Sequence, residues 1–379
     1  MKGLENDQYV CAFHDVSDEE LSANKKNIQK YDSSNQNTSL NLEHLLFPIF
    51  RYERLKLKNL SDQPKAPYAE CFTSAFNEEA SLLACGYSNG FVNIFDLVNK
   101  KEPVKFRVSE SPVMSLKWNE KKKLILLVGS ADGSISHWHV QSGKSLSVIK
   151  EENNAINCVD YAFDYSSFLT AGTDFTIKIY DENMKTQITI LKSIKFEKPG
   201  DVGRVFCAKF TPGNTSTIYC GGWDRTIRFF DVRSGKVANS ITGPEICGDA
   251  LDMSGSILAS GAWSTKDQIQ LWDIRSLKCV CNVEWEDKSL NKNTYIYSVK
   301  FNKRKEKQYL SIGGVNKPLF RLFDMSTFKA NKTKPTPIFG NAEEYSPCYT
   351  TDFVNVTNTK DLFCCGCGDG GVRVYSLTN

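Results

Sequence analysis

Short stretches of alternating apolar and polar residues recur along most of the chain. Each stretch ends near an aromatic residue, and successive aromatics lie 42 to 52 residues apart. An apolar residue stands three positions before the aromatic in every copy. Alternation of this kind, rich in β-branched and aromatic residues, predicts a buried β-strand. The seven copies read NGFVNIFD, DGSISHWH, DFTIKIYD, DRTIRFFD, DQIQLWD, PLFRLFD and DGGVRVYS.

A second apolar stretch, which ends in glycine, precedes each copy. Turn residues join the two stretches, so each pair predicts a β-hairpin. A further strand upstream and a weaker one downstream complete a unit of four antiparallel strands. Five copies carry a short acceptor side chain in the turn, where it can bond backbone amides. These predicted structural turn residues are Asn89, Asp132, Asp174, Asp224 and Asp369.

Seven such units cannot each bury both faces alone, and radial packing in a ring solves that problem. The spacing and the closing aromatic–Asp pairs resemble the WD-repeat family of β-propellers over residues 67–379. The resemblance implies an all-β, seven-bladed propeller with four-stranded antiparallel blades. The pairs that carry it are Phe95-Asp96, Tyr180-Asp181, Phe230-Asp231, Trp272-Asp273 and Phe323-Asp324.

One feature of that family is missing from the repeats. The family's Gly-His pair, whose histidine bonds an aspartate within the blade, does not occur. The chain has only four histidines, His14, His44, His137 and His139. We therefore expect the blades to be held by packing, without the buried polar network that is usual in this family.

The last copy lacks an outer strand, because the sequence ends four residues after Tyr375. Residues 50–60 alternate well enough to supply it, and the family commonly closes its ring with an N-terminal strand. We expect this strand to hide an otherwise exposed edge. The predicted organisation is a polar arm at 1–41, a ring-closing segment at 42–66 and the propeller at 67–379. Within the arm, Ser17 and Glu20 form a capping box that predicts a short helix.

Composition narrows the class of protein. The chain is 41% hydrophobic with a net charge of +3, which gives no strong electrostatic reason to expect nucleic acid as the main partner. No apolar run approaches the roughly 18 residues of a membrane helix, and the acidic N-terminus is unlike a signal peptide. Thirteen cysteines without small-domain spacing suit a reducing compartment. We expect a soluble protein of the cytoplasm or nucleus, with no membrane insertion.

The cysteines and histidines offer candidate metal ligands. Cys364, Cys365 and Cys367 lie close together in FCCGCGDGG, and thiolates at close spacing suit zinc. Cys365, however, occupies the repeat slot before the blade glycine, which favours core packing. His137 and His139 share one face of a strand but replace structural residues of other copies. We expect no metal, no cofactor and no small-molecule substrate, and no catalytic motif indicates an enzyme.

Surface recognition has better support. In the family, the rim that carries the aspartate turns is the usual peptide-binding face. Trp223 and Trp263 lie on this rim in adjacent copies, and tryptophan is enriched at binding hot spots. We expect a non-catalytic interaction scaffold that binds protein segments on the rim and over the channel, within a multiprotein complex. The predicted binding residues are Trp223, Trp263, Arg204, Asp249, Tyr295, Tyr297, Tyr345 and Tyr349.

Two alternatives remain open. The tandem motifs FDVR and WDIR, which end in Arg233 and Arg275, resemble those of substrate receptors of cullin-RING ubiquitin ligases. In such receptors the arginine meets the adaptor protein. The second alternative is an RNA-associated propeller, because the loops at 119–123 and 302–307 are basic. These loops belong to separate blades, which argues against one continuous patch.

Overall fold

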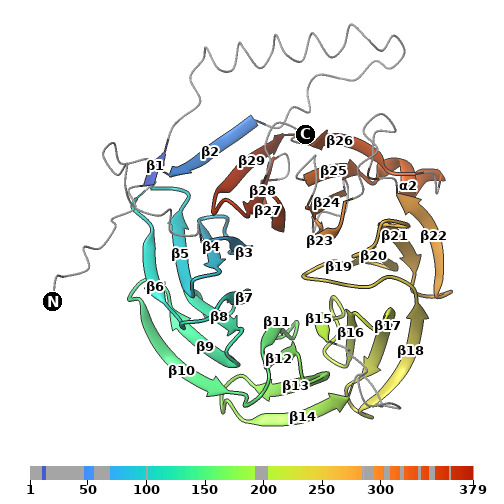
Figure 1. Cartoon of the computed structure of the whole chain (residues 1–379), viewed down its shortest axis with the longest axis horizontal. Coiled ribbons are helices and arrows are strands. Elements are labelled where there is room, and N and C mark those ends of the chain that lie inside the picture. Colours follow the sequence, from blue (N-terminus) through green and yellow to red (C-terminus); the bar gives the residue numbers. More distant parts are fainter. Residues whose placement is uncertain are drawn as a thin grey trace, which may run out of the picture.

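Seven antiparallel β-sheets stand around a common centre in the computed structural model of the chain (Figure 1). The first strand of each repeat is innermost and the last lies at the perimeter. This arrangement confirms the predicted all-β, seven-bladed propeller. The structure describes residues 11–13, 47–54, 69–99, 101–192, 204–283, 285, 294–302, 308–315, 320–331, 334–340, 346–357 and 360–378.

Each of the first six blades is built from four consecutive strands. Blades one to three comprise β3 (Cys71–Phe76), β4 (Leu82–Tyr87), β5 (Phe91–Asp96), β6 (Val104–Arg107), β7 (Val113–Asn119), β8 (Ile125–Ser130), β9 (Ser134–His139), β10 (Lys144–Lys150), β11 (Ile156–Tyr161), β12 (Ser167–Gly172), β13 (Thr176–Asp181) and β14 (Gln187–Lys192). Blades four to six comprise β15 (Val205–Phe210), β16 (Thr217–Gly222), β17 (Thr226–Asp231), β18 (Lys236–Thr242), β19 (Leu251–Ser254), β20 (Ile257–Gly261), β21 (Ile269–Asp273), β22 (Lys278–Val283), β23 (Ile296–Phe301), β24 (Tyr309–Gly314), β25 (Phe320–Asp324) and β26 (Thr336–Gly340).

The seventh blade combines the two ends of the described chain. It contains β27 (Cys348–Thr357), β28 (Lys360–Cys367) and β29 (Val372–Thr378). An N-terminal strand, β2 (Phe47–Arg54), pairs antiparallel with β29, and β1 (Cys11–Phe13) pairs with β2 as a fifth strand. The ring is therefore closed by an N-terminal strand, as the sequence predicts.

Some local predictions differ from the structure or fall outside it. The strand β2 begins three residues before the predicted segment 50–60, and residues 55–60 lie outside the described residues. The helix expected at Ser17 also lies outside them. A short helix that the sequence analysis did not predict, α2 (Ser326–Asn331), connects β25 to β26. Its six residues are too few to show a helical period.

A glycine one residue before the end of the second strand lets the next blade approach closely, as in β8 and β16. A Cβ atom on Gly129 would lie 2.7 Å from Cγ2 of Ile156, and one on Gly221 would lie 2.9 Å from Cγ1 of Ile246. Both isoleucines precede or begin the inner strand of the following blade and are fully buried. The recurring glycine is thus a packing requirement between blades.

Buried polar networks, and not packing alone, hold the blades together. The expectation that the blades lack such a network is therefore wrong. Glu151 is buried between blades two and three, where its carboxylate accepts hydrogen bonds from three side chains. The donors are Asn154 Nδ2 at 2.7 Å, Thr170 Oγ1 at 2.6 Å and Tyr180 OH at 2.9 Å. Lys178 adds an ion pair to the same carboxylate. A buried glutamate from the strand connection therefore builds a polar network without the family's histidine.

His137 belongs to a second buried network. Its Nε2 lies 3.0 Å from Oε2 of Glu182, and its Nδ1 lies 3.0 Å from Oγ of Ser147. Burial lowers the pKa of His137. Burial by itself would raise the pKa of Glu182, but hydrogen bonds to His137 and Lys185 lower it to about 2. The His137 imidazole therefore has a structural role, and it links the third strand of blade two to blade three.

Candidate functional site

One end of the ring carries most of the predicted binding residues. In six of the seven blades, all but blade four, a backbone hydrogen bond among the described residues joins the turn after the second strand to the segment that enters the inner strand. Examples are Ser88 N to Glu70 O at 2.9 Å and Trp263 N to Glu245 O at 2.8 Å. These turns and entering segments form what we call the upper face.

The predicted turn residues each accept a hydrogen bond from the backbone amide two positions later. The five distances run from 2.8 Å at Asp369 to 3.3 Å at Asn89 and Asp224. Arg228 also pairs with Asp224, and Arg373 Nη2 lies 3.0 Å from Asp369 Oδ2. These bonds fix the turn backbone of the upper face, because each closes a loop of only a few residues.

Five aromatic side chains follow one another across the upper face. Centroid separations are 4.6 Å for Trp263 and Tyr295, 4.7 Å for Trp263 and Tyr297, 4.9 Å for Tyr297 and Tyr349, and 5.3 Å for Tyr349 and Phe72. We call this set the aromatic run. All five side chains are partly exposed. The run crosses blades five, six, seven and one, so four blades share one aromatic surface.

Two aromatic residues of this face were not predicted, although the sequence carries a signal for them. Phe72 and Phe206 are the second residues of inner strands β3 and β15. Tyr297 and Tyr349 hold the same slot in β23 and β27. The recurrence of an aromatic in one register position indicates a common face, because alternate strand residues point the same way.

Trp223 lies in a separate group. Its ring centroid is 5.3 Å from that of Phe206, and the Arg204 guanidinium carbon is 5.5 Å from the Trp223 ring. Among the described residues, no ring contact joins Trp223 to Trp263. The two tryptophans therefore belong to different parts of the upper face. Tyr345, another of the predicted binding residues, lies outside the described residues.

A carboxylate borders the aromatic run. The Tyr349 hydroxyl lies 3.4 Å from Oε1 of Glu70, which is partly exposed at the entry to blade one. Burial and the neighbouring Glu70 raise the pKa of Tyr349, and burial raises that of Tyr297. Both phenols stay protonated at neutral pH and can donate hydrogen bonds. The surface thus offers aromatic rings beside a negative charge.

Charged residues alternate in one slot of the inner strands. The slot lies directly before the aromatic residue or methionine near the end of each inner strand. From blade two to blade seven it holds lysine and aspartate alternately, and in blade one it holds Ala75. Lys117 Nζ lies 2.9 Å from Oδ1 of Asp160, and Lys209 Nζ lies 3.5 Å from Oδ1 of Asp252. The inner charged ring comprises Lys117, Asp160, Lys209, Asp252, Lys300 and Asp352.

Asp249, one of the predicted binding residues, forms ion pairs with two lysines of the inner charged ring. Its two carboxylate oxygens each lie 2.6 Å from a lysine Nζ, that of Lys209 on one side and that of Lys300 on the other. Burial alone would raise the pKa of Asp249, but the two lysines hold it well below its usual range. Asp249 therefore joins blades four, five and six.

Arg233 and Arg275 lie at the opposite end of the ring, on turns between third and fourth strands of blades four and five. Their side chains are 79% and 74% exposed. Each arginine folds back on the aspartate two residues earlier, with Arg275 Nη2 at 2.9 Å from Asp273 Oδ2 and Arg233 Nε at 3.4 Å from Asp231 Oδ1. Both arginines remain open to solvent on neighbouring blades.

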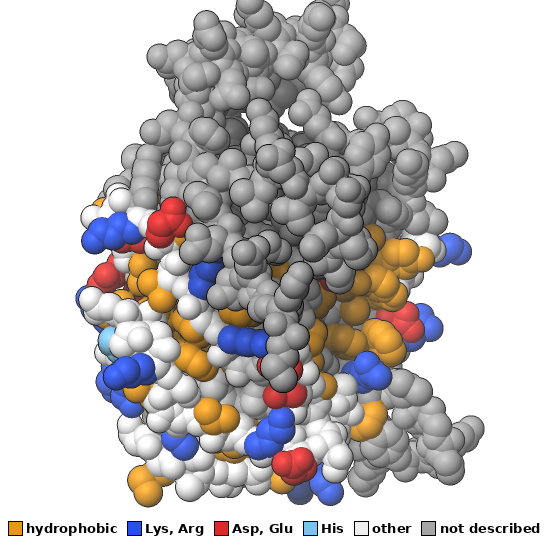
Figure 2. All heavy atoms as spheres, turned by 60° about the vertical axis from the view of Figure 1, so that its left-hand side comes forward, with side chains coloured by type: hydrophobic (Ala, Val, Ile, Leu, Met, Phe, Trp, Pro, Cys, Tyr) orange, Lys and Arg blue, Asp and Glu red, His pale blue; other side chains and the backbone are white. Residues whose placement is uncertain are grey.

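The basic loop at 119–123 is partly neutralised by acidic neighbours. Lys123 pairs with Glu79, and Lys122 Nζ lies 3.6 Å from Oε1 of Glu182. Residues 303–307 of the second basic loop lie outside the described residues. On the side of the molecule that Figure 2 displays, the coloured lysine and arginine side chains are scattered among acidic, polar and apolar ones. This distribution gives no continuous basic surface on the described part of that side.

Two family models match parts of the chain. The model described as "WD domain, G-beta repeat" matches residues 193–231, which include strands β15 to β17. The model described as "Eukaryotic translation initiation factor eIF2A" matches residues 29–189. Both matched ranges include strands of the propeller blades.

Several curated proteins are similar to segments of the chain. Eukaryotic translation initiation factor 3 subunit I of Taeniopygia guttata is 32% identical over 115 residues, which cover 29% of this chain and 34% of that protein. E3 ubiquitin-protein ligase COP1 of Pisum sativum is 23% identical over 250 residues, which cover 62% and 35%. Protein SPA1-RELATED 3 of Arabidopsis thaliana is 24% identical over 210 residues, which cover 53% and 24%. The chain spans well under half the length of each relative.

The described part of the chain contains no helix with the length and apolar character that crossing a membrane requires.

Proposed function

We propose that this chain, a WD-repeat β-propeller, is a non-catalytic scaffold that binds a segment of a partner protein across its upper face, as part of a multiprotein complex. The aromatic run is the observation that carries the proposal. It brings partly exposed rings from four blades into one surface. Aromatic side chains of this kind dominate binding energy when a partner covers them.

The rigidity of the face supports the same function. Each ring of the aromatic run packs on another ring of the run, and Asn89 and Asp369 fix the turn backbone of blades one and seven. Little conformational entropy is lost when such a surface binds, because its side chains are already ordered. A partner segment therefore meets a preformed surface.

The position of Glu70 indicates the chemistry of the bound segment. A lysine or arginine side chain placed over the aromatic run would contact the faces of the rings and the Glu70 carboxylate at once. The Tyr349 hydroxyl, 3.4 Å from Glu70 Oε1, adds a hydrogen-bonding group at the same place. We therefore propose a partner segment with a basic residue flanked by apolar ones.

The experiment compares the two faces of the ring. Tagged full-length chain is purified from cells beside a Trp263→Ala, Tyr349→Ala variant and an Arg233→Ala, Arg275→Ala variant, with proteins quantified by mass spectrometry. We expect the aromatic variant to lose a defined set of partners that the arginine variant keeps. Partner sets that are unchanged in the aromatic variant would contradict the proposal. So would binding that nuclease treatment abolishes, which would favour the RNA-associated alternative.

A second candidate function rests on a different observation. Arg233 and Arg275 are exposed on adjacent blades, at the end of the ring opposite the upper face. The chain is similar to COP1, which its name describes as an E3 ubiquitin-protein ligase. We propose, as the alternative, a substrate receptor of a cullin-RING ubiquitin ligase. Loss of a ligase adaptor from the arginine variant alone would support this function, and an arginine variant that keeps every partner would remove it.

A further inference from the structure

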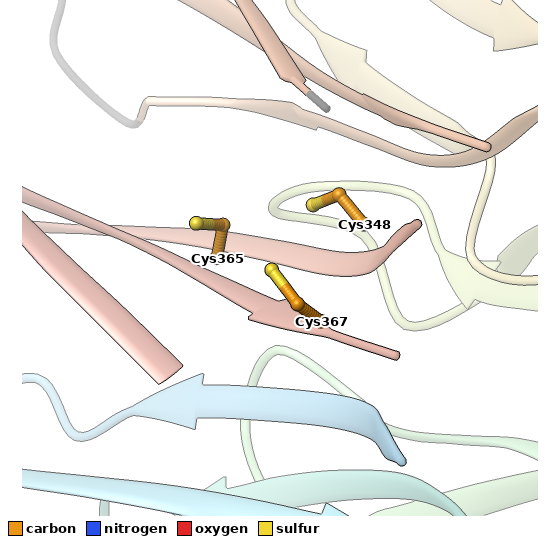
Figure 3. A group of neighbouring side chains, drawn as sticks. All are labelled: Cys348, Cys365 and Cys367. Atoms are coloured by element: carbon orange, nitrogen blue, oxygen red, sulfur yellow. The ribbon is translucent and has the colours of Figure 1, made fainter. Parts of the chain in front are cut away.

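Three cysteines meet inside the seventh blade. Cys348 begins β27, and Cys365 and Cys367 lie near the end of β28. Their sulfur atoms all lie within 4.8 Å of one another, and none of the three side chains is exposed. Figure 3 shows the three cysteine side chains close together on neighbouring strands. We call this set the cysteine triad.

The strand register explains why these three meet and a fourth does not. Cys348 is the direct cross-strand partner of Cys367, and a bulge after Cys348 brings Cys365, two residues away on the same face, beside them. Cys364 faces the other side of β28, where its sulfur lies 3.5 Å from Ser74 Oγ. The sequence-based grouping of Cys364, Cys365 and Cys367 is therefore replaced by one that includes Cys348.

The other blades show that packing does not require three thiols here. Blade one has the same register, with Cys71 paired to Tyr87 and Ser74 paired to Cys85. It thus carries cysteine in two of the three slots and tyrosine in the third. In blade two the slots hold Val113, Val128 and Ser130. Of blades one, two and seven, only the seventh has cysteine in all three slots.

A buried cation stands beside the cysteine triad. Arg373, in β29, is 8% exposed. Its Nη1 donates a hydrogen bond to Cys367 Sγ at 2.9 Å, and its Nη2 lies 3.0 Å from Asp369 Oδ2. A guanidinium that donates to sulfur stabilises negative charge on the three sulfur atoms. Three thiolates carry a net charge of about −1 around Zn2+ and about −2 around Cu+, and Arg373, which also pairs with Asp369, offsets part of this charge.

The surroundings exclude water from the cysteine triad. The cluster that contains it is apolar and aromatic, formed at the contact between blades six and seven by residues such as Phe320, Phe363 and Tyr375. A site with these walls retains a bound ion, because no solvent molecule competes for its ligands. Sulfur ligands select soft cations such as zinc and copper(I) over hard ones such as magnesium.

We propose that Cys348, Cys365 and Cys367 form a structural binding site for one soft d10 metal cation, Zn2+ or Cu+, between β27 and β28. Three sulfur atoms each at about 2.3 Å from one ion lie about 4 Å apart, which the present arrangement reaches with small side-chain rotations. On binding, each thiol releases its proton to solvent and donates a lone pair to the ion. No electron is transferred.

The experiment uses the reduced, full-length chain. Metal is removed with a chelator under anaerobic conditions, and the chain is titrated separately with Zn2+ and with Cu+ against a competing chelator. The metal content is measured by mass spectrometry and the unfolding temperature by calorimetry. We expect about one ion per chain, and a rise in unfolding temperature on binding. The relative affinities in the two titrations identify which cation the site prefers.

Variants locate the ion. Cys367→Ala and Cys365→Val should bind at least about tenfold more weakly than the unaltered chain, since each removes one of three ligands. Valine is acceptable at Cys365 because Val128 fills that slot in blade two. Cys85→Ala is the matched control: Cys85 is equally buried in the same slot of blade one, where only two thiols meet. This control should bind as the unaltered chain does.

Three results would overturn the proposal. The first is an unaltered reduced chain that takes up neither cation in stoichiometric amount. The second is a Cys85→Ala variant that loses as much affinity as Cys367→Ala. The third is a disulfide between two cysteines of the triad in the chain as isolated from cells. The unaltered chain tests the proposal even where a variant fails to fold, because its metal content can be measured without any substitution. A further titration with Cd2+ as a zinc substitute should give the ultraviolet charge-transfer absorption of cadmium bound to thiolates.

Discussion

The Asp352 carboxylate accepts a hydrogen bond from the backbone amide of Phe76, with an N–O distance of 2.9 Å. This bond joins the last blade to the first across the point where the ring closes. Asp160 and Asp252 make the equivalent bonds to the amides of Phe210 at 3.0 Å and Phe301 at 2.7 Å. The aspartates of the inner charged ring therefore link each of these blades to its successor.

Removing the Asp352 carboxylate should weaken the closure of the ring. The Asp352→Ala variant leaves the Phe76 amide without this acceptor, and we expect the free energy of unfolding to fall by about 1–3 kcal/mol. Asp352→Asn keeps a side-chain oxygen in place and should lose less. Urea denaturation at neutral pH measures both values. Equal losses in the two variants would show that the hydrogen bond does not stabilise the closure.

Lys209 should be the most sensitive lysine of the inner charged ring. It lies 2.6 Å from Asp249 and 3.5 Å from Asp252, and its side chain is only 8% exposed. Lys209→Met removes one of the two lysines that pair with Asp249 and a lysine beside Asp252, while Lys300 remains as a partner of Asp249. We therefore expect a loss of about 1–3 kcal/mol in the free energy of unfolding. The control is Lys117→Met, because the Lys117 side chain is 39% exposed. If Lys117→Met lowered the free energy of unfolding as much as Lys209→Met, burial of the lysine would not explain the sensitivity of this position.

The stability of the protein should fall in acid partly through Glu182. Because the pKa of Glu182 is lowered from 4.5 to about 2, its contribution is present above the higher value and is lost as the pH falls toward the lower one. Glu182→Gln should therefore flatten the decline in unfolding free energy between these two pH values. The measurement is a series of denaturant titrations against pH. An unchanged slope in the variant would contradict the pKa shift.

Truncation separates the role of the ring-closing strand from that of the residues before it. A chain that begins at residue 47 keeps β2, so we expect it to melt near the temperature of the full chain. A chain that begins at residue 55 leaves β29 as an unpaired edge, and it should melt earlier and self-associate. Calorimetry and light scattering measure these properties. Equal melting of both truncated chains would show that β2 does not stabilise the blade.

The fold was predictable because its signal is repeated. Seven copies of one strand pattern, with glycine in a constant slot, indicate a ring even though each copy alone is ambiguous. The buried polar networks were not predictable. Glu151 and Glu182 lie in connections between strands, where no repeated position marks them, and they bond residues tens of positions away. The missing Gly-His pair therefore gave a wrong expectation about how the blades are held.

The candidate site was predictable in part. The upper face follows from the family resemblance and the turn positions, whereas the contacts between individual rings depend on which strands become neighbours. Lysine and aspartate alternate visibly in the inner strands, yet this pattern has meaning only once adjacent blades are known to touch. Cys348 joins Cys365 and Cys367 for the same reason, because a strand register brings it there from seventeen positions away.

The central claim is that the aromatic run binds a partner segment, and one affinity measurement tests it most directly. A partner captured by the full chain is reduced to its binding segment, and its dissociation constant is measured by calorimetry for the unaltered chain, for Trp263→Ala, and for the Arg233→Ala, Arg275→Ala variant. We predict that the tryptophan variant binds at least about thirtyfold more weakly, the loss typical of a hot spot, while the arginine variant binds normally. Unchanged affinity in the tryptophan variant, with loss in the arginine variant, would contradict the account.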